Sequence, residues 1–303
     1  MKIIFFGIGS IAKKHIEILR KDKRNSLFSF KSKTNLKYVK KVNGYKEILQ
    51  IKPDIAFITN PTSHHLKTLI DIHKFNMNIF VEKPITNNLK DFLIFKEKYK
   101  SYKKTIYVAY NQRFNPILNF LNVRYLKKTI PLSVNIICSS NLNNWRKKNS
   151  LKYYSAHKKK GGGVIYDLSH ELDYVHLLFG KKIAKSKLII SKGKESNVTK
   201  DSDDYAYIHF KTRNGPIFIY LSYFTNRDER LIKIDFKNFT LVCDLLNERI
   251  IKFINNRKIS EIKFKNSVKI MYEEQMKYFL TNIKKNIIIN NVKSSEYLIK
   301  NFF

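Results

Sequence analysis

Asp167 and His170 are the residues of this chain whose types and spacing most directly suggest chemistry. They stand in the segment GGGVIYDLSHELDY, residues 161–174, behind three consecutive glycines in a sequence that has only nine. An imidazole can accept a proton from a hydroxyl group, and a neighbouring carboxylate can fix its tautomer and stabilise the imidazolium. We therefore predict an acid–base site here. The alternative is a solvated helix face that carries ordinary charges.

A helix over residues 164–179 would position these two side chains. Its apolar residues recur at i, i+3, i+7, i+10 and i+14, and they are Ile165, Leu168, Leu172, Val175 and Phe179. The two titratable side chains and Tyr174 fall on another face, and residues three apart are neighbours on a helix surface. The glycines allow a sharp turn and leave N–H groups free at the helix N-terminus. Because Glu171 and Asp173 follow closely, the sequence leaves open which carboxylate faces a ligand.

A second group of small residues stands at the start of the chain. The segment Gly7-Ile8-Gly9-Ser10-Ile11-Ala12 follows the apolar run KIIFF and precedes helical spacing, which is the context of a dinucleotide-binding turn. The first glycine permits the tight turn, and the second lets the backbone approach a pyrophosphate at the helix N-terminus. An ordinary strand-to-helix turn is the alternative. The predicted cofactor contacts are Gly7, Gly9, Ser10 and Ile11.

The end of the next predicted strand bears on which dinucleotide binds. An Asp or Glu about 20 residues beyond the fingerprint would accept hydrogen bonds from the ribose hydroxyls and favour NAD. Here SLFSF is followed by Lys31, Ser32 and Lys33, with no carboxylate. A cation and a hydroxyl suit a 2′-phosphate, so the sequence leans towards NADP. In so lysine-rich a chain, chance is the alternative explanation.

Alternating strand and helix signals organise the first third of the chain. The strand-like runs KIIFF, SLFSF, PDIAFIT, NIFV and TIYVAY are separated by segments with helical spacing, which is typical of a parallel sheet with crossover helices. His15 shares a line with Ile11 and Ile18 on the first helix and is predicted to pack in the core. Later strand-like runs follow one another more directly, as SKLIIS, YAYIHF, IFIYLSYF, LIKIDF and IIKFIN.

The predicted fold is therefore α/β with two domains, for which a chain of 36.0 kDa has ample length. Residues 1–115 form an N-terminal Rossmann domain, a doubly wound parallel sheet that binds NAD(P). Residues 116–303 form a C-terminal α/β domain with a largely antiparallel open sheet, which binds the substrate.

Composition limits the class of protein. The chain is 43% hydrophobic and rich in Phe and Tyr, which argues against disorder. A formal net charge of +35 would suit a nucleic-acid-binding protein, but the lysines are scattered and no zinc-finger or RNA-binding signature is present. The excess of Lys, Ile and Asn over Ala, Gly and Pro indicates an A/T-rich genome. We therefore expect no specific nucleic-acid partner.

The start of the chain and its cysteines bear on where the protein works. MKIIFFGIGSIA has the length of a signal-peptide core, but a buried strand that runs into a glycine turn explains the same residues, and we favour that strand. No apolar run is long enough to span a bilayer. Cys138 and Cys243 have neither disulfide-framework nor metal-ligand spacing. We expect a cytoplasmic protein with no membrane partner and no metal.

Three further segments complete a family pattern. NPTSHH, residues 60–65, follows the third predicted strand, Glu82-Lys83-Pro84 follows the fourth, and VAYNQRFNP, residues 108–116, closes the fifth. With the opening fingerprint and the glycine-led segment, they resemble the Gfo/Idh/MocA family of pyridine-nucleotide oxidoreductases in type and order. The resemblance extends through WRKKNSLKYYSA, residues 145–156, and fades after about residue 180.

The resemblance implies roles for residues of both domains. It puts Lys83 beside the nicotinamide, as a proton donor or acceptor or as an orienting cation. Proton transfer at this position is reasonable because desolvation beside a cationic ring disfavours the ammonium form of the lysine. It makes Asp167 and His170 the substrate-binding acid–base pair, although many members space the pair as Asp-x-x-x-His. The loops facing the cofactor would contain Asn60, Pro61, His65 and Glu82.

The resemblance also implies an activity and an assembly. Hydride would move between NAD(P) and a carbinol carbon of a sugar, inositol or sugar-nucleotide, with Tyr110, Arg113 and Trp145 near the substrate. Arg113 either binds an acidic substrate or braces the domain junction. The open face of the C-terminal sheet would form a homo-oligomer. The alternatives are a lyase or glycosidase that holds NAD without net redox change, and a ligand sensor or nucleic-acid-binding protein. The sugar, the carbon and the direction are left open.

Overall fold

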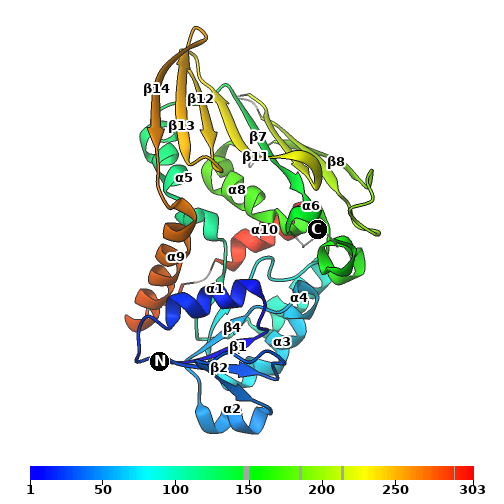
Figure 1. Cartoon of the computed structure of the whole chain (residues 1–303), viewed down its shortest axis with the longest axis vertical. Helices are drawn as coiled ribbons and strands as arrows, with labels where there is room; N and C mark the ends of the chain where they lie inside the picture. The colour runs from blue at the N-terminus through cyan, green and yellow to red at the C-terminus, as the bar shows by residue number, and fades with distance from the viewer. Residues whose placement is uncertain (146–149, 184–185, 213–214, 290) are drawn as a thin grey trace. The chain divides into compact units, whose positions relative to one another are not determined.

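The computed structural model describes residues 1–145, 150–183, 186–212, 215–289 and 291–303. These divide into two compact units, one of Met1–Tyr110 with Tyr272–Phe303 and the other of Asn111–Met271 (Figure 1). Residues 146–149, which belong to the segment 145–156 that resembles the family, lie outside the described residues.

The first unit is built on a six-stranded parallel sheet with the order β3-β2-β1-β4-β5-β6. Its strands are β1 Lys2–Phe6, β2 Ser26–Phe30, β3 Val39–Val42, β4 Ile55–Ile58, β5 Asn78–Val81 and β6 Ile106–Val108. Its helices are α1 Ser10–Leu19, α2 Tyr45–Ile51, α3 His65–Ile72, α4 Leu89–Lys98, most of α9 Ser267–Lys284, and α10 Val292–Phe302. This strand order confirms the predicted doubly wound Rossmann sheet.

The central strands are apolar along their whole length because both faces of the sheet are covered. Ile3, Ile4 and Phe5 of β1 and all residues of β4 are fully buried. Phe57 of β4 and Phe80 of β5 stack with ring centroids 4.6 Å apart. The core of this unit therefore follows from the continuous apolar runs seen in the sequence.

The end of the chain packs with the first unit, although the predicted second domain extended to residue 303. Phe279 of α9 lies edge-on to Phe57 and Phe80, at centroid distances of 6.0 and 5.1 Å. Just before α10, the Asn291 side chain accepts from Val108 N and donates to Val108 O, both at 2.7 Å. These contacts over more than 150 residues of sequence are the physical reason why residues 272–303 belong to the first unit.

The second unit is built on an eight-stranded sheet with the order β14-β13-β12-β11-β7-β10-β9-β8. Only β7 and β10 pair in parallel among these strands of the described chain. Its strands are β7 Ser133–Asn141, β8 Lys187–Gly193, β9 Tyr205–Lys211, β10 Ile217–Ser222, β11 Phe224–Asp235, β12 Thr240–Asp244, β13 Arg249–Ile254 and β14 Arg257–Lys263. The prediction of a largely antiparallel sheet is confirmed.

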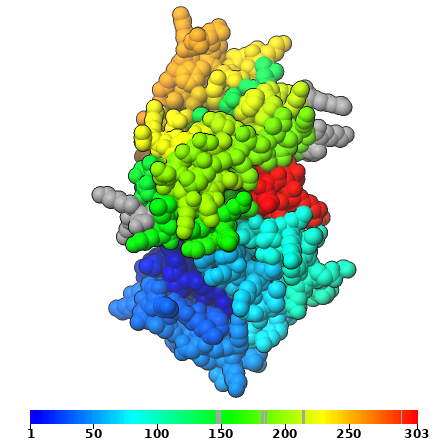
Figure 2. Space-filling view, turned by 90° about the vertical axis from the view of Figure 1, so that its right-hand side faces the viewer, coloured from blue at the N-terminus to red at the C-terminus, as the bar shows by residue number. Residues whose placement is uncertain are grey.

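Helices cover one face of this sheet and leave the other open. The helices are α5 Pro116–Leu121, α6 Leu142–Trp145, α7 Val164–Asp167 and α8 Ser169–Ile183, and α5 and α8 lie along one face (Figure 1). In β7, Val134 and Ile136 are buried on that face, whereas Asn135 and Ile137 are half-exposed. Strands β8 to β10, yellow-green in Figure 2, form much of the visible surface of this unit.

The predicted helix over residues 164–179 is two helices in the structure. The backbone leaves the helical region at Leu168, with φ −94° and ψ 18°, and separates α7 from α8. The predicted apolar stripe is buried in full. Tyr174, which we expected on the polar face, is also fully buried. The single non-helical residue Leu168 changes the direction of the chain between α7 and α8. The periodic pattern of apolar residues does not reveal this break.

Candidate active site

The glycine turn after β1 meets the loop after β4. Gly7 has φ +102°, and a Cβ at this position would lie 2.6 Å from Asn60 N. Thr59 Oγ1 donates to Gly7 O at 2.6 Å and holds the two loops together. Strands β1 and β4 are neighbours at the point where the strand order reverses, which is where α/β sheets bind ligands. Gly7 is therefore required by the close approach of the Asn60 loop.

Gly9 serves a different purpose, at the N-terminus of α1. It is the N-cap residue and has no side-chain capping bond, so the first N–H groups of the helix face outward. No atom of the described residues lies within 4 Å of a Cβ built on Gly9, and Ser10 beside it is exposed. The open space and the unfilled N–H groups fit a pyrophosphate approaching the backbone.

Lys83 stands in a turn that a buried histidine holds on each side. It follows β5 and is half-buried. On one side, His15 Nε2 lies 2.8 Å from Glu82 Oε1. On the other, His65 Nδ1 lies 3.0 Å from Pro84 O. Both imidazoles are at most 1% exposed, so buried contacts hold the Glu82 side chain before Lys83 and the Pro84 carbonyl group after it.

His65 also ties this turn to the loop that meets Gly7. Its Nε2 lies 2.9 Å from Asn60 O. Burial lowers the pKa of His65, although the carbonyl groups oppose this change. A neutral imidazole has one N–H and can donate to only one of these two carbonyl oxygens at a time. His65 is nevertheless buried between the two loops and contacts both. The Asn60 side chain donates to Thr68 Oγ1 at 2.8 Å, and Pro61 is exposed beside it.

Lys31 and Ser32 lie just past the end of β2. Lys31 has φ +46°, and its Nζ lies 5.4 Å from the centroid of the Phe30 ring. Ser32 Oγ donates to Thr34 O at 3.2 Å and accepts from Thr34 N at 3.1 Å. The Lys31 side chain is exposed, so its charge is available to an anion at the strand end.

Backbone geometry accounts for each of the three glycines before α7. Gly161 has φ +79° and Gly163 has φ +127°, conformations that favour glycine. A Cβ on Gly162 would overlap Tyr154 O and lie 2.5 Å from Ser155 O. The glycine run therefore lets the chain pass over the segment at 154–155 before entering α7.

Asp167, at the end of α7, is held by two tyrosines. Its carboxylate accepts from Tyr154 Oη at 2.8 Å and from Tyr223 Oη at 2.7 Å. Trp145 lies edge-on to the Tyr223 ring, 5.4 Å away, and is 38% exposed. The predicted residues Trp145 and Asp167 are thus joined through Tyr223.

His170, at the start of α8, contacts the neighbouring carboxylate Glu171. His170 Nε2 lies 3.0 Å from Glu171 Oε1, and the same oxygen accepts a short hydrogen bond from Arg230 of β11. Burial alone would raise the pKa of Glu171, but the charge of Arg230 and the contact with His170 lower it to about 2. Ligand atoms of Cys138, His170 and Glu171 lie within 4.8 Å of one another, and Arg230 supplies the positive charge there.

Arg113 forms an ion pair with Asp173, the second carboxylate of α8. Its Nε and Nη2 donate to the two oxygens of Asp173, at 2.8 and 2.5 Å. Asp173 is fully buried, so this arginine braces the second unit. Tyr110, in the first unit, is fully buried and its hydroxyl lies 3.1 Å from Ser295 Oγ.

Two family models match the chain in the order of its units. Residues 1–110 match the NAD-binding Rossmann fold of an oxidoreductase family, and residues 133–234 match the C-terminal alpha/beta domain of the same family. The chain belongs to the Gfo/Idh/MocA oxidoreductase family. The resemblance found in the sequence is thereby confirmed.

Curated relatives align with part of the chain. The 2,7-anhydro-N-acetylneuraminate hydratase of Escherichia coli K12 is 28% identical over 132 residues, which are 42% of this chain and 34% of that protein. An uncharacterized oxidoreductase of Streptococcus pneumoniae serotype 4 is 24% identical over 57% of this chain and 44% of that protein. The chain thus spans less than half the length of these relatives.

Solved structures of the family align with nearly the whole chain. A levoglucosan dehydrogenase in complex with NADH and levoglucosan has a TM-score of 0.82 and 13% identity, over 99% of this chain and 94% of that one. A UDP-N-acetylglucosamine 3-dehydrogenase from Acidithiobacillus ferrooxidans has a TM-score of 0.75 and 15% identity, over 99% and 95%. These likenesses establish the family fold.

The sequence did not predict the hydrogen-bond and ion-pair partners of the site residues. His15 was expected only to pack, yet it also holds Glu82. Adjacent helical residues do not face each other on a regular helix, so the contact between His170 and Glu171 had no periodic signal. Arg230 lies 59 residues from Glu171 in the sequence, and no local pattern connects them.

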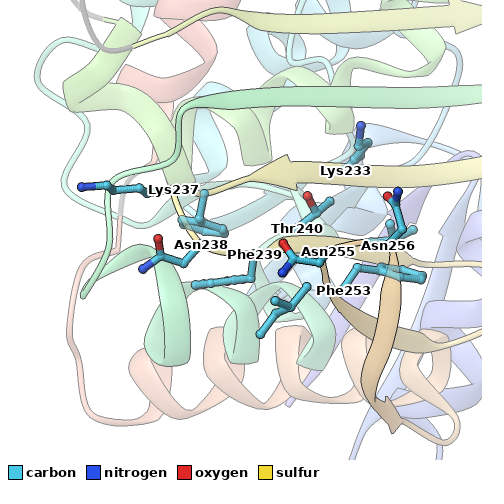
Figure 3. Close-up of a pocket in the computed structure, with 11 residues that line it drawn as sticks. Lys233, Lys237, Asn238, Phe239, Thr240, Phe253, Asn255 and Asn256 are labelled. Carbon is cyan, nitrogen blue, oxygen red and sulfur yellow. The ribbon is translucent and has the colours of Figure 1, made fainter.

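Two hollows of the second unit lie away from the predicted residues, on the open face of its sheet. One, of about 760 Å³, is lined by Lys233 of β11, Phe253 of β13, and the turn residues Asn255 and Asn256 among others (Figure 3). The other, of about 580 Å³, is lined by residues of β7 to β10. Neither contains a predicted site residue. Among the described helices, none is long and apolar enough to cross a membrane.

Proposed function

We propose that the protein is an NAD(P)-dependent dehydrogenase or reductase that acts on a carbinol carbon of a sugar-like substrate. The observation that carries this proposal is the meeting of the Gly7 turn with the Asn60 loop at the reversal of strand order. The anchored Lys83 turn follows the next strand. In this proposal the first unit binds the cofactor and the second binds the substrate.

The proposed reaction needs a proton and a hydride to leave the same alcohol. When bound, the nicotinamide ring supplies the hydride acceptor or donor. In the direction of oxidation, the C–H bond breaks and its hydrogen leaves with both bonding electrons as hydride. The O–H bond also breaks, its proton passes to His170 or Lys83, and the C=O bond forms. Asp167, fixed by Tyr154 and Tyr223, orients a substrate hydroxyl.

Two matched glycines test the cofactor site. Gly9 and Gly44 are both N-cap residues with extended backbone, and in the described part of the chain neither has an atom within 4 Å of an added Cβ. Gly9→Ala should weaken NADH and NADPH binding by about tenfold or more, because the methyl group blocks the pyrophosphate. Gly44→Ala should leave binding unchanged. Quenching of Tyr and Trp fluorescence measures both, and equal affinities would place the pyrophosphate elsewhere.

Replacing Lys83 tests the chemistry. Lys83→Ala should lower kcat by about 10²- to 10⁴-fold, because an acid–base group is lost, while cofactor affinity is kept. Lys90→Ala, at an exposed lysine of α4, is the control. Rates come from absorbance of the reduced nicotinamide across a panel of sugars, inositols and sugar-nucleotides. Full activity in Lys83→Ala would remove this residue from the mechanism.

We further propose that the cofactor is NADP rather than NAD. The exposed Lys31 and the hydroxyl of Ser32 at the end of β2 support this preference, since a 2′-phosphate accepts charge-assisted hydrogen bonds. Lys31→Ala should reduce NADPH affinity by about tenfold and leave NADH affinity unchanged. Tighter NADH than NADPH binding by the unmodified protein would refute the preference.

A second candidate is a reaction without net redox change, with NAD held tightly. The observation that favours it is the 28% identity with a hydratase. Cofactor that survives purification and is not consumed would identify this version. Net production of reduced nicotinamide with a sugar would exclude it.

We propose that a second copy of the chain covers the open sheet face. Ile189, Tyr207 and Phe218 are 47, 56 and 42% exposed on β8, β9 and β10, and Tyr207 stacks on Tyr220 at 4.7 Å. Exposed apolar surface of this kind is typical of an interface. Phe218→Asp should convert a dimer or larger oligomer into a monomer in sedimentation velocity. A monomeric unmodified protein would refute the proposal.

We propose a reducing, cytoplasmic location on the basis of two free, buried cysteines, Cys138 and Cys243. Cell fractionation tests it directly. Recovery outside the cytoplasm would overturn it.

A further inference from the structure

The larger of the two hollows in the second unit is formed by two tight turns and the strands beside them. Its volume of about 760 Å³ suits a small organic ligand. The turn after β11 is closed by a hydrogen bond from Phe236 N to Phe239 O at 2.9 Å. The turn between β13 and β14 contains Asn255 and Asn256, with φ +47° and +61°, which is typical of a two-residue β-hairpin. Short, well-defined turns therefore shape this hollow.

Side chains of β11, β12 and β13 form the floor of the hollow. Lys233 is paired with Val242, and Thr240 is paired with Phe253. Because paired residues point to the same side of a sheet and residues two apart share a face, these four side chains lie on one face. The next residue of β11, Ile234, is fully buried on the other face. The floor is therefore part of the sheet itself.

Three phenylalanine rings line the hollow. Phe236 and Phe239 stack with ring centroids 4.6 Å apart and an interplanar angle of 23°. Phe236 is buried, whereas Phe239 and the third ring, Phe253, are half-buried and offer part of their surface to a ligand. Stacking on such rings is how proteins bind nucleobases of any type, because every base has a π-face.

The charge of the lining is positive. Lys233 and Lys237 line the hollow, and none of its described lining residues is acidic. Lys233 Nζ lies 3.6 Å from Asp235 Oδ1, so part of its charge is neutralised. Lys237 is exposed and takes part in no ion pair among the described residues. Lys252 adds a further positive charge, with Nζ 4.5 Å from the centroid of the Phe239 ring. The ligand that fits this lining is an anion.

We propose that this hollow binds a mononucleotide, with its base stacked on Phe253 and its phosphate at Lys237. The two side chains lie at opposite ends of the group drawn in Figure 3, which matches a ligand with a base at one end and a phosphate at the other. The exposed amide groups of Asn255 and Asn256 both donate and accept, as the edge of a base requires. Inorganic phosphate would leave the rings unused, and an uncharged aromatic compound would leave the lysines unused.

Isothermal titration calorimetry with ADP tests the site, in a protein that also carries Gly9→Ala so that the cofactor turn is impaired. We expect ADP to bind about tenfold more tightly than pyrophosphate, because a stacked base adds to the phosphate contact. Phe253→Leu should weaken ADP binding about tenfold and leave pyrophosphate binding unchanged, since leucine offers no ring face. Lys237→Ala, at an exposed position where folding is unaffected, should weaken both about tenfold. The control Lys211→Ala, at an exposed lysine of β9 outside the hollow, should change neither.

Four results would overturn the proposal. ADP binding that neither Phe253→Leu nor Lys237→Ala weakens would place ADP elsewhere, and equal affinities for ADP and pyrophosphate would leave only an anion site. A single-stranded oligonucleotide that binds more tightly than ADP, and loses affinity in the same variants, would assign the hollow to nucleic acid. Binding found only in the Phe218→Asp protein would show that a second copy of the chain fills the hollow. None of these results bears on NADH binding or sugar turnover, so the proposed function is tested separately.

Discussion

Replacing Glu171 by Gln should make the protein's stability less sensitive to acid. The folded pKa of Glu171 is about 2 against an ordinary value of 4.5, a separation that corresponds to about 3 kcal/mol. Because the folded pKa is the lower one, this stabilisation is complete at pH 7 and is lost as the pH falls from about 4.5 towards 2. At pH 3.5 the loss should be about 1 kcal/mol.

Urea unfolding followed by far-UV circular dichroism measures this loss. The difference in unfolding free energy between the unmodified protein and Glu171→Gln should shrink by about 1 kcal/mol between pH 7 and pH 3.5. Taking the difference cancels groups that titrate equally in both proteins. Arg230→Met should behave in the same way, because a protonated Glu171 no longer needs the guanidinium. Differences that are the same at both pH values would refute the ionised, buried carboxylate.

Three further predictions concern other parts of the chain. Gly162→Ala should lower the free energy of unfolding by about 2 kcal/mol or more, because its Cβ would overlap two carbonyl oxygens. The control Gly180→Ala would place its Cβ at an ordinary 3.7 Å from its neighbours inside α8, so it should leave the free energy of unfolding unchanged or raise it in the same urea titration. His15→Leu should lower kcat more than cofactor affinity, because Glu82 loses its buried partner beside Lys83. An unchanged kcat would show that the turn at Lys83 does not depend on His15. Burial raises the pKa of Cys243 to about 12, so it should react with Ellman's reagent only on unfolding, and rapid reaction in the folded protein would contradict its burial.

The sequence predicted the features that depend on local patterns. Continuous apolar runs gave the strands of the parallel sheet, and the Gly7 and Gly9 spacing located the first turn at the reversal of strand order. The apolar runs and the glycine spacing each lie within the strand or turn that they predict. The apolar stripe of residues 164–179 likewise predicted which residues are buried, because helical periodicity is itself a burial pattern.

Features that depend on distant contacts could not be predicted. The pairing of Glu171 with Arg230 joins α8 to β11, and Phe279 reaches a sheet formed more than 170 residues earlier. No spacing within either segment encodes such a meeting. The break at Leu168 was missed for another reason, since one residue with altered ψ leaves the apolar periodicity on both sides intact.

The return of the chain end to the first unit has a consequence for synthesis in the cell. Asn291 caps the free edge of β6, and Phe279 covers Phe57 and Phe80, yet both are translated long after residue 110. At 5–20 residues per second, about 10–40 s separate β6 from its cap on the ribosome. During that time a nascent chain exposes an unpaired strand edge, which can pair with other chains. We therefore expect the yield of folded protein to depend on how well chaperones shield the nascent chain, and C-terminal truncations to accumulate as aggregates.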